Sequence, residues 1–174
     1  MAEDTMRDRI LDAAESRARQ SGYHGFSFRE LASDVGIKSA SVHYHFPTKA
    51  VLAEALTERY AQTALERLGA PEGPLEAFNR VAALFREAVE VEDKMCQCGM
   101  FGAERDSLPP EVAAATERYF QRLTELLERA APKNPAPYRA ETILSAFEGA
   151  LLLVKALDDP SVFDRVVADL RRAY

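Results

Sequence analysis

The sequence predicts an all-α protein of about nine helices, with a three-helix N-terminal head and a larger C-terminal helical bundle. The first observation is that every long segment between Gly or Pro breaks carries apolar residues at helical spacing. The second is that no segment shows the alternating pattern of a strand. The chain has 174 residues, of which 47% are hydrophobic and 29% charged, so it can bury a core. This length excludes a large barrel or a two-domain dinucleotide-binding enzyme.

The first two helices are expected within residues 6–35. Apolar residues recur at helical spacing over residues 6–20, and Gly22 follows as an end signal. Ser27 stands three residues before Glu30, the spacing of a capping box, which predicts that a second helix starts there. Gly36 predicts its end.

The third helix is short, at about residues 39–46, and Pro47 is expected to open the fourth by fixing its first turn. That fourth helix runs towards the stretch 69–74. Helical spacing resumes at Phe78 and breaks near Cys98 and Gly99. The remaining pieces are expected at 100–105, from Pro110 to about Ala131, at about 138–158, and from Pro160 onward.

The composition indicates a soluble protein of the cytoplasm. The longest uncharged apolar run is Gly149–Val154, far below the roughly 20 residues that span a bilayer. The charged first dozen residues lack the apolar block of a secretory signal. Cys96 and Cys98 lie too close together in the sequence for a disulfide between them to stabilise the fold, as expected in a reducing compartment.

The charge of the chain is unevenly distributed. Its net charge is −6, which at first sight argues against a nucleic-acid partner. Residues 1–50, however, hold seven Lys/Arg and seven Asp/Glu, which leaves 15 and 21 for the remainder. The segment 35–53 contains two lysines and two histidines but no acid. It therefore points to a local binding surface.

Residues 28–46 have the pattern of two helices that cross at a steep angle. Ala32 falls where the two backbones come closest, and Gly36 falls at the corner, where a left-handed conformation needs no Cβ. Apolar residues at four further positions face a shared core. Together these six positions predict a helix-turn-helix. The four apolar positions are Leu31, Val35, Ile37 and Val42.

The run from Gly36 to Lys49, followed by Ala-Val-Leu, resembles the recognition-helix signature of the tetracycline-repressor (TetR) family, and Phe26–Val35 resembles that family's second helix. The resemblance covers roughly the first 60 residues. It implies a dimer whose N-terminal heads bind operator DNA and whose C-terminal bundle binds a small ligand. Two residues depart from the family pattern: Val42 replaces the usual Leu, and His43 stands where a phosphate-contacting Tyr is usual.

The start of the third helix is expected to enter the major groove. Lys38 and Tyr44 should carry most of the base readout, because the Ser and Ala side chains between them encode little hydrogen-bond information. Phosphate contacts are expected from Lys49 and from the start of the second helix, with the two histidines assisting. The predicted DNA-binding residues are Ser27, Arg29, Lys38, Ser39, Ala40, Ser41, His43, Tyr44, His45 and Lys49.

We expect neither a metal nor a cofactor. His43 and His45 are two residues apart, so on a helix they point in nearly opposite directions and cannot hold one ion.

The C-terminal bundle is expected to supply a dimer face and a ligand pocket. The last two helices are so apolar that we expect them to pair across a two-fold axis; the residues are Phe147, Ala150, Leu151, Val154, Phe163, Val166 and Leu170. The pocket is expected where the helical pattern breaks; its candidates are Phe85, Cys96, Cys98, Met100, Phe101, Tyr119 and Leu123. Four polar groups could orient a ligand, and the sequence does not rank them: Lys94, Arg105, Arg122 and Glu148.

These patterns predict a regulator with a DNA-binding domain over residues 1–48 and a ligand-binding and dimerisation domain over 49–174. We expect a non-enzymatic repressor that a small molecule releases from its operator, with no membrane partner. One alternative is a thiol- or electrophile-sensing regulator acting through Cys96 and Cys98. A thiol enzyme or metal-binding bundle around the same cysteines is a second, and an adaptor with a degenerate DNA head is a third.

Overall fold

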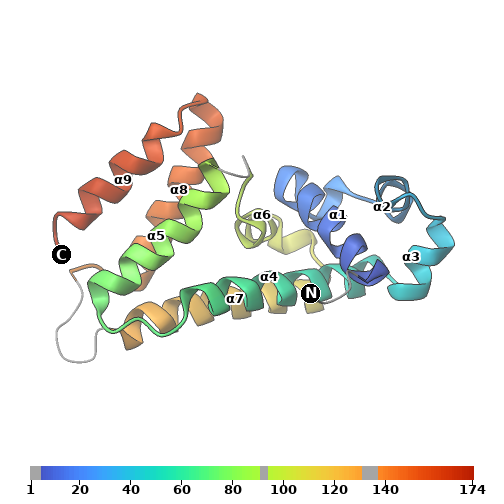
Figure 1. Ribbon diagram of the computed structural model, residues 1–174, viewed down its shortest axis with the longest axis horizontal. Coiled ribbons are helices and arrows are strands. Elements are labelled where there is room, and N and C mark those ends of the chain that lie inside the picture. The colour runs from blue at the N-terminus through green and yellow to red at the C-terminus, as the bar shows by residue number, and fades with distance from the viewer. Residues whose placement is uncertain (1–4, 91–93, 131–136) are drawn as a thin grey trace. The chain divides into compact units, whose positions relative to one another are not determined.

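The computed structural model describes residues 5–90, 94–130 and 137–174 (Figure 1). All regular structure in these ranges is helical, which confirms the predicted all-α class. Two short 3₁₀ turns, η1 (Tyr23–Gly25) and η2 (Arg105–Ser107), accompany the α-helices. The α-helices are α1 (Met6–Ser21), α2 (Phe28–Val35), α3 (Ser39–His45), α4 (Lys49–Leu68), α5 (Pro74–Glu90), α6 (Gln97–Ala103), α7 (Pro110–Arg129), α8 (Ala140–Leu157) and α9 (Ser161–Arg171).

The described residues form two compact units. The head unit comprises the residues up to Ala61 together with Gln97–Tyr119, and the bundle unit comprises Gln62–Cys96 and Phe120–Tyr174. Helices α4 and α7 therefore each contribute to both units. The head unit extends well past the three N-terminal helices, because α6 and the first part of α7 pack with them. The predicted boundary at residue 48 separates a DNA-binding domain from a ligand-binding and dimerisation domain by their functions, and it stays a prediction.

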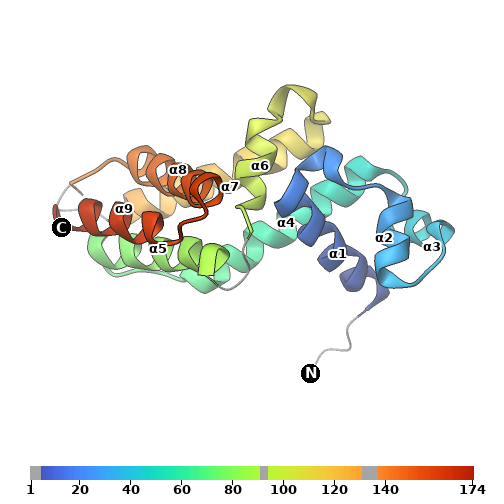
Figure 2. The ribbon, with the colours of Figure 1, turned by 90° about the horizontal axis from the view of Figure 1, so that it is seen from above.

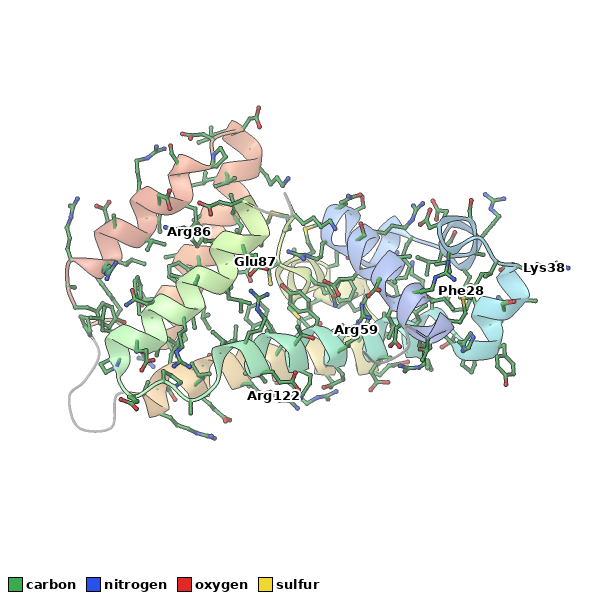
Figure 3. All side chains as sticks on the ribbon, viewed as in Figure 1. Phe28, Lys38, Arg59, Arg86, Glu87 and Arg122 are labelled. Carbon is green, nitrogen blue, oxygen red and sulfur yellow. The ribbon has the colours of Figure 1, made fainter. Side chains whose placement is uncertain are left out.

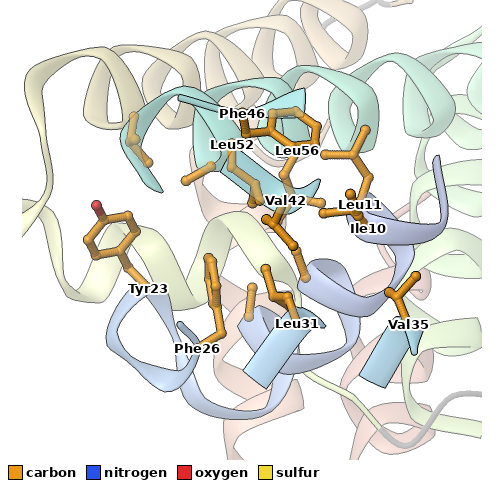
Figure 4. Packing of buried hydrophobic residues seen from close by; sticks show 14 of the residues in the cluster. Ile10, Leu11, Tyr23, Phe26, Leu31, Val35, Val42, Phe46, Leu52 and Leu56 are labelled. Atoms are coloured by element: carbon orange, nitrogen blue, oxygen red, sulfur yellow. The ribbon is translucent and has the colours of Figure 1, made fainter. Parts of the chain in front are cut away.

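One apolar cluster holds the head unit together (Figure 4). Leu31 and Val42, from the two helices of the predicted helix-turn-helix, are fully buried in it. Phe101 of α6 and Val112 of α7 belong to the same cluster, each with no exposed surface. Burial of a large apolar side chain contributes about 1.5–3 kcal/mol. Helix α6 is therefore part of the core that supports the N-terminal helices.

Polar contacts fix α1 against α2. The Arg9 guanidinium donates from Nη2 to the Val35 carbonyl oxygen at 2.9 Å, which satisfies an orphan carbonyl at the end of α2. The Arg17 guanidinium donates to both carboxylate oxygens of Asp34, at 2.5 and 3.0 Å. This hydrogen bonding holds the pKa of Asp34 below its ordinary value. The short helix α2 is thus anchored at its C-terminal end.

The bundle unit is built on an aromatic core. Figures 1 and 2 both show α5, α8 and α9 side by side. The Phe147 ring lies at the centre of this layer, with ring centroids 5.5 Å from Phe78, 5.6 Å from Phe85 and 5.5 Å from Phe163. All four rings are almost completely buried. Such pairs add about 0.5–1.5 kcal/mol each beyond their buried area.

Two predicted boundaries differ from the structure. Helix α4 starts at Lys49 rather than at Pro47, because the Thr48 hydroxyl accepts the Val51 amide at 3.2 Å and so caps the first turn. Helix α6 starts at Gln97, so Gly99 lies within a helix instead of breaking it. The predicted end of α7 at Ala131 lies outside the described residues.

Candidate DNA-binding surface

Helix α2 has well-defined signals at both ends. The Ser27 hydroxyl accepts the Glu30 amide at 3.4 Å and donates to the Glu30 carboxylate at 2.7 Å. This bonding lowers the pKa of the Glu30 carboxyl. At the other end Gly36 adopts φ 76° and ψ 36°, and the next amide, of Ile37, donates to the Ala32 carbonyl at 2.9 Å. This left-handed turn directs the chain from α2 into α3.

Helix α3 buries one side and leaves the other exposed. Val42 is completely buried, and Phe46 directly after the helix is 1% exposed. On the outward side Tyr44 is 85% exposed, and Lys38 at the start of the helix projects from the end of the head (Figure 3). Large aromatic side chains are seldom left this accessible without a partner. The outward side of α3 is therefore the leading candidate for a binding surface.

The other predicted DNA-contact residues on these helices fall into two groups. Some lie fully on the surface: Ser27, Arg29, Ala40 and His43. Others are half-buried: Ser39, Ser41 and His45. The His43 ring packs edge-on against Phe28 of α2, with ring centroids 4.6 Å apart, so its position is fixed relative to α2. The structure therefore brings these residues together on α2 and α3, and their contact with DNA stays a prediction.

Lys49 makes contacts within the chain that the sequence did not predict. Its ammonium donates to the Phe26 carbonyl oxygen at 2.6 Å and lies 4.4 Å from the ring centroids of both Tyr23 and Phe26. Burial lowers the pKa of this ammonium, and the charges of Glu104 and Glu30 oppose that shift. Lys49 joins the two ends of the helix-turn-helix, and its contact with phosphate stays a prediction.

The predicted ligand-contact residues are all buried or half-buried, and each unit holds some of them. Phe101 packs in the head core, where its ring centroid lies 6.1 Å from that of Tyr23. Tyr119 pairs with Tyr60, with centroids 5.6 Å apart. Cys98 and Met100 also belong to the head unit, and Phe85, Cys96 and Leu123 to the bundle unit. Their role in ligand binding remains a prediction.

The two thiols do not support the sensing alternative. Cys96 is 2% exposed and Cys98 has no exposed surface. Reactive cysteines lie in partly exposed, electropositive surroundings, and buried ones behave as small apolar residues. The Cys96 thiol also hydrogen-bonds to the carboxyl of Glu148.

Glu148 is the carboxyl group of the bundle unit that the structure singles out. Its Oε1 atom is buried and has no hydrogen-bond partner within the part of the chain that the structure describes. Burial raises the pKa of the Glu148 carboxyl from 4.5 to about 7, while the bond from Cys96 opposes this shift. The sequence placed Glu148 among four unranked polar candidates, because helical spacing alone does not reveal which carboxyl is desolvated.

Gln97 and Glu104 are two further residues that sequence reasoning missed. Gln97 is completely buried and donates from Nε2 to the Thr57 hydroxyl at 3.1 Å. Glu104 accepts the Tyr23 amide at 2.6 Å. Both contacts join segments at least 40 residues apart, so local spacing carried no signal for them.

The described residues contain no group of three or more His, Cys, Asp or Glu that could hold a metal ion. Among the same residues no helix is long and apolar enough to cross a membrane.

An exposed short helix on a fixed helix-turn-helix defines a DNA-binding protein of the helix-turn-helix class. The comparison with known families agrees. Residues 10–56 match the family of bacterial regulatory proteins described as the tetR family, and residues 74–169 match the LmrA/YxaF-like transcriptional regulator C-terminal domain. The chain belongs to the TetR family of transcriptional regulators.

Two solved structures resemble the whole chain. A TetR transcriptional regulator from Legionella pneumophila is 27% identical, with a TM-score of 0.83 over 99% of this chain and 98% of that one. A TetR-family regulator from Agrobacterium tumefaciens is 26% identical, with a TM-score of 0.83 over 95% of each chain.

A curated relative resembles only the N-terminal region. The biofilm operon icaADBC HTH-type negative transcriptional regulator IcaR of Staphylococcus aureus is 39% identical over 49 residues. The match spans 28% of this chain and 26% of that protein.

Proposed function

We propose that this chain is a homodimeric repressor that binds operator DNA through α3 and leaves it when a small molecule binds the bundle. The observation that carries the proposal is the exposed side of α3, where Tyr44 is 85% exposed in a helix-turn-helix fixed by internal contacts. As the sequence predicted, this function places the protein in the cytoplasm. Repression is the sign of regulation that matches the negative regulator IcaR.

The exposed residues divide by the chemistry they offer to DNA. Lys38 can donate to guanine O6 and N7 in the major groove, and the Tyr44 hydroxyl reaches outward one turn further along α3. Ala40, with a small side chain between them, lets the helix approach the base edges closely. Arg29 and the Ser27 hydroxyl at the start of α2 are placed to contact phosphates. Lys49 stays among the proposed phosphate contacts, and its ammonium also donates to the Phe26 carbonyl.

The proposed dimer face uses α8 residues other than those predicted. Phe147, Ala150, Leu151, Val154 and Phe163 are at most 6% exposed within a single chain, so they have almost no surface to bury against a partner. On the same helix Leu152, Leu153 and Leu157 are 59%, 44% and 62% exposed. Exposed leucines on one helix are characteristic of an interface. Val166 and Leu170 of α9 are half-buried and remain candidates.

The bundle unit is the proposed site of the small molecule. Glu148 supports this assignment. One of its buried carboxyl oxygens lacks a donor, so a ligand that donates a hydrogen bond to this oxygen would bind more tightly. A ligand that binds one arrangement of the chain better than another shifts the population towards that arrangement. Release from DNA then requires that the arrangement favoured by the ligand moves the two heads away from the major-groove spacing of about 34 Å.

Selection of DNA from a random-sequence pool by the purified full-length chain tests the proposal. We expect a two-fold symmetric site, protected by the protein in a footprint and centred on two half-sites. Transcription in vitro from a promoter that carries this site should fall when the protein is added. Recovery of unrelated sequences with equal affinity would contradict the proposed function.

A further inference from the structure

The segment Gln97–Ser107, here called the strap, comprises α6 and η2 and is fastened to the corner between α1 and α2. This corner, Gly22–Gly25, holds the turn η1. Three contacts join the strap and the corner, and they fall on Tyr23 and His24. Both segments belong to the head unit. The strap follows the corner by more than 70 residues, so these contacts are purely tertiary.

The central contact is made by the carboxylate of Glu104. Its Oε2 atom accepts the Tyr23 backbone amide at 2.6 Å. A hydrogen bond from an amide to a carboxylate is stronger than one between neutral groups. On either side of it, the Phe101 ring meets the Tyr23 ring edge-on at 6.1 Å, and the Ser107 hydroxyl lies 3.2 Å from Nε2 of His24.

Gly22 makes room for this carboxylate. A Cβ at position 22 would lie 2.5 Å from Oε1 and 2.6 Å from Oε2 of Glu104, closer than two such atoms approach in proteins. Gly22 also has φ 70° and ψ −166°, a conformation that favours glycine. The absence of a Cβ at position 22 therefore leaves the space that the Glu104 carboxylate fills.

Tyr23 also links Glu104 to the other end of the helix-turn-helix. Lys49 is the first residue of α4, and its ammonium lies 4.4 Å from the centroid of the Tyr23 ring. The same ammonium donates to the carbonyl of Phe26, two residues before α2, and the negative charge of Glu104 favours its charged form. Glu104 thus binds the residue on which Lys49 packs.

We propose that Glu104 is a positioning residue for DNA binding, which holds α2 and α3 in their binding arrangement through the Tyr23 amide. This inference rests on the proposed DNA-binding function. Glu104 itself does not touch DNA. Without its carboxylate the Tyr23 amide loses its acceptor, and the ring on which Lys49 packs is no longer fixed from the strap.

The test uses the full-length chain and the DNA that the wild-type protein selects from a random pool. Glu104→Ala removes both the acceptor and the charge, and we expect about tenfold weaker binding at a temperature where the variant is fully folded. Glu104→Gln keeps an acceptor of similar reach, so it should recover most of the affinity at moderate salt. Asp106→Ala is the matched control, because it removes an exposed acid from η2, the turn that directly follows Glu104, and should leave the affinity unchanged.

A spectroscopic readout separates positioning from general stability. In the ¹H–¹⁵N NMR spectrum the Tyr23 amide should move upfield and exchange faster in Glu104→Ala, and α3 amides should change with it. If Glu104→Ala does not fold, Glu104→Asp, whose shorter side chain reaches the amide poorly, is expected to show the same loss.

The proposal is overturned if a folded Glu104→Ala, or Glu104→Asp in its place, binds the selected DNA as tightly as the wild type. It is also overturned if binding is lost while the Tyr23 and α3 amides stay unchanged. Failure of the wild-type chain to select any DNA would refute the proposed function itself, and the NMR readout would still show whether Glu104 fixes the corner.

Discussion

The head unit and the bundle unit each leave one buried side-chain oxygen without a donor among the described residues, but the two oxygens differ in chemistry. In the head unit it belongs to the neutral amide of Gln97, and Arg17, Lys49 and Glu104 each bind a named partner across a long stretch of sequence. In the bundle unit it belongs to the ionisable carboxyl of Glu148, and three leucines of α8 are exposed. The bundle unit therefore carries both the buried group that can respond to pH and the exposed apolar side that we propose as the dimer face.

The largest effect is expected from the aromatic core of the bundle. Phe147→Ala removes the central ring and should lower the free energy of unfolding by about 3–5 kcal/mol, because the surrounding rings cannot collapse into the space. Urea unfolding followed by circular dichroism measures this change. Leu152→Ala, on the exposed side of the same helix, is the control and should cost far less under conditions where the chain is monomeric. Equal losses would mean that the two faces of α8 are not distinguished as described.

The unsatisfied carboxyl of the bundle predicts an unusual pH dependence. The folded state raises the pKa of Glu148 from 4.5 to about 7, so between these values it binds the proton more tightly than the unfolded state does. The stability contributed by this group is therefore present at low pH and is lost as the pH rises through about 7, a change of about 3 kcal/mol for a shift of this size.

Glu148→Gln should remove this dependence and stabilise the protein at pH 8. Thermal unfolding measured between pH 5 and pH 8 provides the check. Glu141→Gln is the matched control on the same helix, since Glu141 is exposed and its pKa is lowered rather than raised. An unchanged pH profile in Glu148→Gln would show that the carboxyl is already satisfied.

The exposed leucines of the bundle predict the loss of self-association upon mutation. The double substitution Leu152→Asp with Leu157→Asp should weaken the dimer by about a hundredfold or more, because charges placed in an apolar interface are left unpaired. Sedimentation velocity over a concentration series measures this change. The monomeric variant should keep the helical content of the wild type. A dimer of unchanged strength would place the interface elsewhere.

The exposed side of α3 predicts a smaller, specific effect on DNA. Lys38→Ala should weaken binding to the selected site about tenfold and relax the preference at one base pair. Arg29→Ala, at the start of α2, should weaken binding to all sequences alike and reduce the dependence of affinity on salt. Fluorescence anisotropy with selected and scrambled duplexes at several salt concentrations separates the two. Identical behaviour of the two variants would refute the division into base and phosphate contacts.

The smallest expected effects come from two glycines, one in each unit, whose replacement by alanine should change stability in opposite directions. Gly36→Ala should destabilise the head by about 1 kcal/mol, because φ 76° is unfavourable for a residue with a Cβ. Gly149→Ala in the middle of α8 should instead stabilise by about 0.5–1 kcal/mol, since alanine is the better helix former. A Cβ at either position meets open space among the described residues. The opposite signs of the two changes in unfolding free energy therefore report the backbone conformation and not a steric clash. Differential scanning calorimetry of the two variants reads out both.

The sequence predicted those features whose signals are local. The Ser27 and Gly36 end signals and the apolar spacing of Leu31, Val35 and Val42 involve residues that are close together in the sequence. The structure has the same helix-turn-helix, with these residues buried or capping as expected. The all-α class followed from the same kind of evidence.

The features that sequence reasoning missed depend on which surface the fold covers. The apolar stripe around Phe147 was read as a dimer face, but periodicity cannot distinguish a stripe covered by the same chain from one covered by a partner. The bond from Lys49 to the Phe26 carbonyl gave no signal, because the two residues meet only when α4 folds against the corner. Glu104 gave no signal, since the Tyr23 amide it accepts is 81 residues away.

The inward Lys49 also has a practical consequence for building chimaeric regulators. Because its ammonium is bonded to the Phe26 carbonyl, residues 27–48 form a closed cassette whose two ends are joined by one side chain. Recognition segments exchanged between relatives should therefore be cut after Phe26 and before Lys49, so that the recipient keeps both halves of the join. Grafts that take Phe26 and Lys49 from different proteins would transfer α3 without the hydrogen bond that joins the two ends of the segment.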